Sequence, residues 1–246
     1  MGNPIAWFEI LGPEPEKTAG FYSNLLGWHT TPVEGGYTLV DTNGGAGMNG
    51  GISTPPSGWE PGTVFYVADP DIQALLDRAV SMGATTLTPV TEIPNRVTYA
   101  AFSNTWGNRI GLLKGDATGA EVSSGDGVPV DWVEIGCSEP LRAAEFFAGV
   151  FGWTFNTDMT GEGGGPVHAG FDTGAGDVRG GVGSSQDGRP RIDVYAHVDD
   201  VGRYLTGVED LGGTVTMPAM KVDEHTEIGL FTDPQGTGFG LYSATG

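Results

Sequence analysis

The sequence predicts an α+β protein made of four similar units, each with one strand, one helix and three further strands. The main observation is that the second half of the 246-residue chain repeats the first half. A self-match over nearly the whole length means two copies of one architecture, so any site should be built, or lost, in duplicate. The matched pairs include Trp7 and Trp132, Glu9 and Glu134, Phe21 and Phe146, Trp28 and Trp153, Gly51 and Gly181, and Gly111 and Gly240.

Four helices are predicted from apolar residues at helical spacing and from residues that begin or end helices. The first follows Pro15, a residue that the first helical turn accepts, and ends before Gly27, which suits a left-handed cap. The second begins near Asp71 and is closed by Gly83. The other two cover residues 140–151 and 201–208.

Short runs of apolar, aromatic and β-branched residues predict the strands. Each unit has too little apolar surface to be stable alone, so the units should pair and curl their sheets into cups, as half-barrels. The predicted strands are 5–10, 28–31, 37–42, 48–52, 63–67, 85–87, 97–102, 109–113, 131–136, 191–198, 230–231 and 239–242.

The repeat and the composition together divide the chain. A stretch rich in Gly, Ser, Asp and Ala separates the two halves and predicts a linker. We therefore expect one domain over 1–115, a linker over 116–128 and a second domain over 129–246. Domains of this size can bury a core without disulfides or metals.

Charge and hydropathy limit the possible partners and location. The net charge is −20, from 31 acidic and 11 basic residues, and such a field repels nucleic acid and anionic membranes. The apolar runs fall short of the ~20 residues of a membrane span, and no leader precedes Trp7. A single cysteine, Cys137, cannot form an internal disulfide. We expect a cytoplasmic monomer or homodimer that binds neither nucleic acid nor membrane.

Two segments resemble a signature of the vicinal oxygen chelate superfamily, which groups glyoxalase I, bleomycin-resistance proteins and extradiol dioxygenases. They are residues 21–28, FYSNLLGW, and 146–153, FFAGVFGW. Residues 198–201 and 233–236 resemble later landmarks of the family, so the resemblance covers nearly the whole chain. It implies two tandem glyoxalase-like domains, similar to two-domain proteins labelled glyoxalase-like or hydroxylase. Fold alone does not define function.

The same resemblance provides a test for metal chemistry. Members that bind a divalent ion use His or Gln on opening strands and Glu on closing strands. Only Asp193 among the matching positions has a ligating side chain, whereas an open catalytic site needs three protein ligands. We therefore predict neither a metal nor another cofactor. The matching positions are Trp7, Gly62, Gly111, Trp132, Asp193 and Gly240. A site shifted along the strands remains an alternative, built from Glu9, Glu134, Asp193 and His197.

The same strands supply candidate ligand-binding residues. Alternation places Trp7 with Glu9, and Trp132 with Glu134, on the face that the family turns into its cup. An aromatic wall with a few acids and one imidazole suits a planar or cationic organic molecule. His168 matches Tyr37 in the repeat, which favours a packing or cavity-lining role over proton transfer. The full set of candidates is Trp7, Glu9, Tyr37, Trp132, Glu134, His168, Asp193, Tyr195 and His197.

Three functions follow as hypotheses, and the sequence leaves open whether the protein turns over a substrate. The first is a metal-free protein that binds a small, mostly apolar organic molecule, such as a secondary metabolite or antibiotic, for resistance or sequestration. The second is a metal-independent enzyme on a secondary metabolite, with Glu, Asp or His as general acid or base. The third, a metal-dependent lyase or dioxygenase, requires a different alignment of the ligand positions.

Overall fold

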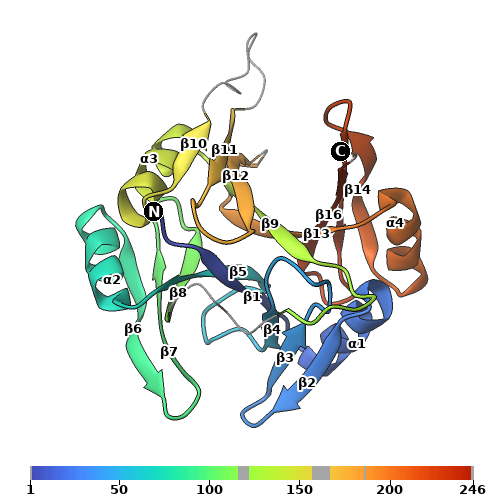
Figure 1. The fold of residues 1–246 in the computed structure, drawn as a ribbon, viewed down its shortest axis with the longest axis horizontal. Coiled ribbons are helices and arrows are strands. Elements are labelled where there is room, and N and C mark those ends of the chain that lie inside the picture. The colour runs from blue at the N-terminus through green and yellow to red at the C-terminus, as the bar shows by residue number, and fades with distance from the viewer. Residues whose placement is uncertain (1, 116–121, 157–166, 186, 245–246) are drawn as a thin grey trace. The chain divides into compact units, whose positions relative to one another are not determined.

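The computed structural model describes residues 2–115, 122–156, 167–185 and 187–244. The sequence of elements β-α-β-β-β occurs four times, which confirms the four predicted units, here called modules 1 to 4 (Figure 1). Module 1 is β1 (Ile5–Leu11), α1 (Pro15–Leu26), β2 (His29–Val33), β3 (Tyr37–Asp41) and β4 (Gly50–Ser53). Module 2 is β5 (Gly62–Asp69), α2 (Ile72–Ser81), β6 (Thr85–Ile93), β7 (Val97–Ser103) and β8 (Arg109–Lys114). Module 3 is β9 (Val130–Cys137), α3 (Pro140–Phe151), β10 (Thr154–Asn156), β11 (His168–Asp172) and β12 (Arg179–Ser184). Module 4 is β13 (Arg191–His197), α4 (Val201–Asp210), β14 (Thr214–Lys221), β15 (Thr226–Thr232) and β16 (Gly238–Ala244).

The helices begin and end for two different local reasons. In α1 and α3 a proline occupies the first turn, and Gly27 and Gly152 end the helix with a left-handed φ of 70°. In α2 and α4 the carboxylates of Asp71 and Asp200 accept hydrogen bonds from backbone N–H groups of the first turn. Helix α2 ends at Ser81, slightly before the predicted closing residue Gly83.

The strands form two mixed sheets of eight strands. Their hydrogen-bonded orders are β2-β3-β4-β1-β5-β8-β7-β6 and β10-β11-β12-β9-β13-β16-β15-β14. Within each module the first strand pairs with a later one in parallel, as Phe8 with Gly50 and Tyr195 with Gly240 show. The α+β class with two glyoxalase-type sheets is therefore confirmed.

The contacts between Cα atoms divide the chain into two compact units, and each unit takes modules from both halves of the sequence. Unit 1 contains α2 with β6 to β8 and α3 with β10 to β12, and unit 2 contains α1 with β2 to β4 and α4 with β14 to β16. The opening strands β1, β5, β9 and β13 are divided between the units. Part of the predicted linker, residues 116–121, lies outside the described residues. Val128, near its end, accepts a hydrogen bond from the Trp28 indole in unit 2.

Each unit has an aromatic core between its helices and sheets. In unit 1 the Trp153 ring stacks on Phe171 with centroids 4.4 Å apart and on Phe147 of α3 at 5.7 Å. In unit 2 Tyr22 of α1 stacks on Trp28 at 5.2 Å. Burying such rings provides much of the driving force for folding.

Strand alternation gives each module a second face, which we call the distal face because it points away from the module's own helix. In module 4 a Cβ built on Gly229 would lie 2.8 Å from Val201 of α4, so Gly229 and its partner Leu241 face the helix. Gly240 and Tyr242 consequently lie on the distal face. In module 3 Phe171 faces the helix, which places His168 on the distal face. Among the described residues, no helix is long and apolar enough to cross a membrane.

Candidate functional site on the distal strand faces

The distal face of module 3 brings together two predicted residues, Glu134 of β9 and His168 of β11. The His168 Nε2 atom lies 3.1 Å from Oε1 and 3.2 Å from Oε2 of Glu134. The two side chains are 31% and 14% exposed, so solvent or a ligand can reach the imidazole while the carboxylate is largely covered. A half-buried acid and imidazole in contact form a group that can hold or transfer a proton.

Two glycines of β12 make this pairing possible. A Cβ built on Gly181 would lie 2.2 Å from His168 Nε2 and 2.7 Å from Glu134 Oε2, and one on Gly183 would lie 3.0 Å from Glu134 Oε1. The side chains of His168 and Glu134 therefore pack directly against the backbone of β12 at these two glycines. The hydrogen bond to Glu134 raises the pKa of His168 above its ordinary value of 6.5, against the opposing effect of burial.

The contact with Glu134 was not predicted, because the match of His168 to Tyr37 favoured a packing or cavity-lining role. A signal was present in the sequence: Gly181 and Gly183 alternate on the strand that follows His168, as small residues do where side chains cross a backbone.

The distal face of module 1 holds the equivalent acid in a different environment. Glu9 is 9% exposed, and its Oε1 accepts a hydrogen bond of 2.9 Å from the Ser53 hydroxyl. Tyr37 lies over Gly51, where a Cβ would be 1.9 Å from the phenol oxygen. Ser53 and Tyr37 match Gly183 and His168 of module 3. In module 1 the acid thus accepts a hydrogen bond from a hydroxyl, whereas in module 3 it contacts an imidazole.

In modules 2 and 4 a tyrosine of the opening strand covers a glycine of the closing strand. Tyr66 pairs with Gly111 and Tyr195 with Gly240. A Cβ on either glycine would lie 2.0 Å or 2.3 Å from the tyrosine ring. Aromatic rings laid over strand glycines in this way stabilise the pairing.

The covered glycines bear on metal binding, because the resemblance to the superfamily matches them to the positions where its metal-binding members carry Glu. The tyrosine rings fill the space that such a side chain would need. Within the described parts of the chain, no three His, Cys, Asp or Glu side chains are grouped so that they could hold a metal ion. The alternative set Glu9, Glu134, Asp193 and His197 forms no such group. The residues present therefore do not fit the family's metal centre.

The distal face of module 4 adds an aromatic cluster in unit 2. The His197 ring stacks on Tyr242 with centroids 4.5 Å apart, and Trp132 lies 6.5 Å from Tyr242. The Tyr242 hydroxyl donates a 2.7 Å hydrogen bond to Asp131, whose other oxygen is 3.8 Å from His197 Nδ1. Tyr242 and Asp131 were not among the predicted residues. Tyr242 could have been found from its alternation with Gly240.

The remaining predicted residues are Asp193, Trp7 and Tyr195. Asp193 is buried on β13, with Oδ1 3.3 Å from a Cβ built on Gly238. Trp7 is half-buried on β1. Tyr195, unlike most distal aromatic residues, is only 6% exposed.

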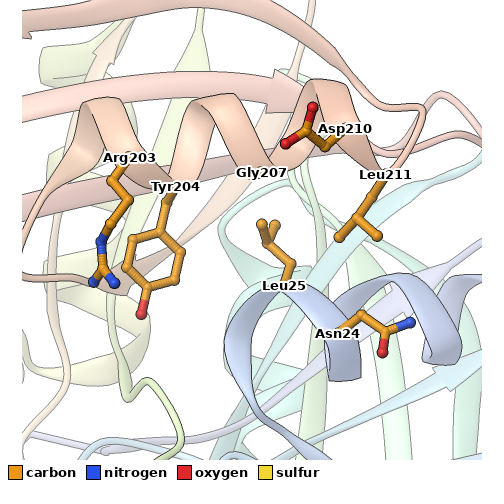
Figure 2. A pocket seen from close by; sticks show the side chains of 7 residues that line it. All are labelled: Asn24, Leu25, Arg203, Tyr204, Gly207, Asp210 and Leu211. Carbon is orange, nitrogen blue, oxygen red and sulfur yellow. The ribbon is translucent and has the colours of Figure 1, made fainter.

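A surface depression of about 370 Å³ lies elsewhere in unit 2, between α1 and α4 (Figure 2). Its lining includes Leu25, Tyr204 and Gly207 and none of the predicted residues. In unit 1 the residue that matches Gly207 is Arg78, whose guanidinium donates a 2.9 Å hydrogen bond to the Val150 carbonyl of α3. The depression exists because Gly207 has no side chain to fill the equivalent groove.

Comparison with known sequences agrees with this architecture. Residues 4–112 match the profile of the Glyoxalase/Bleomycin resistance protein/Dioxygenase superfamily, and residues 132–242 match that of the Glyoxalase-like domain. The chain belongs to this superfamily and contains two glyoxalase-like domains in tandem.

The chain is also similar to two full-length curated proteins. It is 28% identical to the anthracycline biosynthesis protein DnrV of Streptomyces peucetius and 29% identical to the anthracycline biosynthesis protein DauV of Streptomyces sp. strain C5. Each alignment covers 96% of this chain and 91% of the relative.

Solved structures share the fold at low sequence identity. The Mn(II)-bound glyoxalase of Novosphingobium aromaticivorans superposes with a TM-score of 0.68 at 13% identity, over 98% of this chain and 81% of that chain. The 2,3-dioxygenase LapB of Pseudomonas sp. KL28 gives a TM-score of 0.69 at 15% identity, over 100% and 92%.

Proposed function

We propose that this protein binds a small, planar, mostly apolar secondary metabolite on its distal strand faces, without a metal ion. The observation that carries the proposal is the contrast in burial between aromatic residues on the two strand faces. Phe8 and Phe65, in the opening strands, are fully buried, whereas Tyr37, Tyr66 and Trp132 on distal faces are half-buried. Aromatic surface left accessible in this way is typical of a ligand site.

The polar groups on these faces are few and suited to orienting such a ligand. Rings of Tyr and Trp offer flat surfaces for stacking, worth about 0.5–1.5 kcal/mol per ring pair beyond area burial. The Glu134–His168 pair can donate or accept a hydrogen bond at a ligand hydroxyl or carbonyl. A planar molecule with a few oxygen substituents matches both features.

The relatives support this class of ligand. DnrV and DauV are named as anthracycline biosynthesis proteins and align over nearly all of this chain. Anthracyclines are planar, fused-ring molecules with oxygen substituents, and therefore have the required chemistry. We accordingly place the protein in the handling of an aromatic metabolite, as a binding or sequestering protein.

The test is a fluorescence titration of the full chain with an anthracycline in chelator-containing buffer. We expect saturable binding and a rise in melting temperature with ligand concentration. Trp132→Leu should weaken binding about tenfold, because it removes one stacking ring. Trp106→Leu is the matched control, since Trp106 is half-buried in a turn of unit 1, off the distal faces. Absence of saturable binding, or equal losses in both variants, would contradict the proposal.

One observation favours a second candidate, a metal-independent enzyme. The Glu134–His168 contact resembles an oriented general base, in which the acid fixes the imidazole. Incubation of the anthracycline or an earlier polyketide intermediate with the protein would then change its mass, and His168→Gln would abolish the change while retaining binding. An unchanged ligand mass would favour the binding protein.

A further inference from the structure

Unit 2 contains a group of buried polar atoms that the fold does not satisfy. The Thr18 hydroxyl, the Tyr22 hydroxyl and Oδ2 of Asp233 have no hydrogen-bond partner, and the three residues are 0%, 0% and 3% exposed. An unsatisfied buried polar group costs about 1–3 kcal/mol, so native proteins rarely leave several in one place.

The three groups converge on one region between α1 and the turn that joins β15 to β16. Thr18 and Tyr22 are one helical turn apart on the same face of α1. The Tyr22 ring contacts Phe231 and Phe239, which flank the turn, with centroids 6.4 Å and 5.2 Å away. Asp233 lies within that turn, where its Oδ1 accepts hydrogen bonds from the backbone N–H of Gln235 and of Thr237.

Gly12, which has no side chain, lies beside these groups. A Cβ built on Gly12 would lie 3.1 Å from the Thr18 Oγ1 atom and 3.9 Å from the Thr237 Oγ1 atom. The Thr237 hydroxyl itself donates to the Leu11 carbonyl at 3.4 Å. The surroundings of Gly12 are therefore polar, and a side chain there would press against the Thr18 hydroxyl.

In the equivalent region of unit 1, apolar or mutually hydrogen-bonded side chains replace these three groups, and the buried hydroxyl without a partner is that of Ser185, whose backbone N–H donates to the Cys137 carbonyl. Cys137 occupies the position of Gly12 and is fully buried, and Ala143 and Phe147 replace Thr18 and Tyr22. Asn104 replaces Asp233, and its amide donates to the Asn108 side chain at 3.1 Å. Unit 2 thus carries polar groups without partners at three positions where unit 1 carries apolar or mutually hydrogen-bonded ones.

We propose that unit 2 contains a specific buried water site, in which one water molecule bridges the Tyr22 hydroxyl, the Asp233 carboxyl and the Thr18 hydroxyl. Three hydrogen bonds to otherwise unsatisfied groups are the usual coordination of a structural water. The site ties the centre of α1 to the turn after β15. Burial raises the pKa of Asp233, and burial together with the charge of Asp233 raises the pKa of Tyr22, which agrees with the two side chains lying near each other.

The direct test is a crystal structure of the full chain at a resolution that shows ordered solvent. We expect one peak within hydrogen-bonding distance of Tyr22, Asp233 and Thr18, and none at Phe147 and Asn104 in unit 1. Direct hydrogen bonds among the three side chains with no peak would overturn the proposal. So would an ion, identified by anomalous scattering after a rubidium soak.

A variant series tests the same site in solution. Gly12→Cys, which introduces the unit 1 residue, should displace the water and lower the melting temperature by several degrees. The same substitution should cost less in a background with Tyr22→Phe and Asp233→Asn, which removes two partners of the water and keeps the Thr18 and Thr237 hydroxyls nearest the new side chain. Equal decreases in both backgrounds would show that Gly12 is needed for steric reasons alone and would contradict the water site.

Discussion

Modules 1 and 3 carry the same acid on the same face of equivalent strands, yet they surround it differently. Glu9 accepts a hydrogen bond from a serine and shares its face with a tyrosine, whereas Glu134 contacts an imidazole. The difference arises from two pairs of matched residues, Ser53 with Gly183 and Tyr37 with His168. The two modules thus keep the same strand scaffold but differ in their polar groups. Module 3, unlike module 1, places an imidazole against its acid.

The largest expected effect comes from filling the glycine under the Glu134–His168 pair. Gly181→Ala should destabilise the protein by about 1–3 kcal/mol, because the new Cβ would overlap the imidazole and the carboxylate. Chemical denaturation gives the free energy of unfolding. Gly170→Ala is the matched control on the same face, since its Cβ would approach no atom closer than 3.9 Å. Equal effects of the two substitutions would contradict the described packing.

A second prediction uses the raised pKa of His168. Because the folded-state pKa lies above 6.5, the stability from this pair is fully present below pH 6.5 and is lost as the pH rises through the folded pKa. The loss should be on the order of 1 kcal/mol, the scale of a partly exposed ion pair.

The measurement is denaturation at a series of pH values. The double variant His168→Tyr with Gly183→Ser, which copies module 1, should lose this dependence. A double variant that keeps the wild-type pH profile in this range would argue against the pairing.

The smallest expected effect concerns the depression between α1 and α4. Leu25→Val with Gly207→Arg copies unit 1 and should stabilise unit 2 by about 0.5 kcal/mol, because arginine is the better helix former. The change includes Leu25 because its methyl group would lie 3.1 Å from the new Cβ. Thermal denaturation measures the gain, and Arg78→Gly should show a loss. A destabilised double variant would refute the proposed equivalence of the two grooves.

Local elements were predictable from sequence because their signals are local. Proline in the first turn and a left-handed glycine defined α1 and α3, and the repeat defined the four modules. Several strands were longer than predicted: β6 continues to Ile93, with β-branched residues such as Thr88, Val90 and Thr91 past residue 87. Strands β10, β11, β12 and β14 lacked a clear apolar run, since glycine and threonine replace the usual β-branched hydrophobic residues.

The strand face of the candidate residues was predictable from the sequence, but their contact partners were not. Alternation correctly placed Glu134 on the distal face, yet the contact with His168 depends on strand register, which residue spacing does not determine. Asp131 and Tyr242 are far apart in sequence and meet only after the module 4 strands are assembled. The residues at Gly111 and Gly240 are visible in the sequence itself, and the prediction of no metal that rests on them stays a prediction.

From the resemblance to the superfamily, we propose that the tyrosines over Gly111 and Gly240 fill former metal-ligand positions. Equilibrium dialysis of the full chain against Mn(II), followed by elemental analysis, tests it most directly. We expect far less than one bound ion per chain. One tightly bound ion per chain, lost on substitution of Glu9, Glu134 or Asp193, would contradict it.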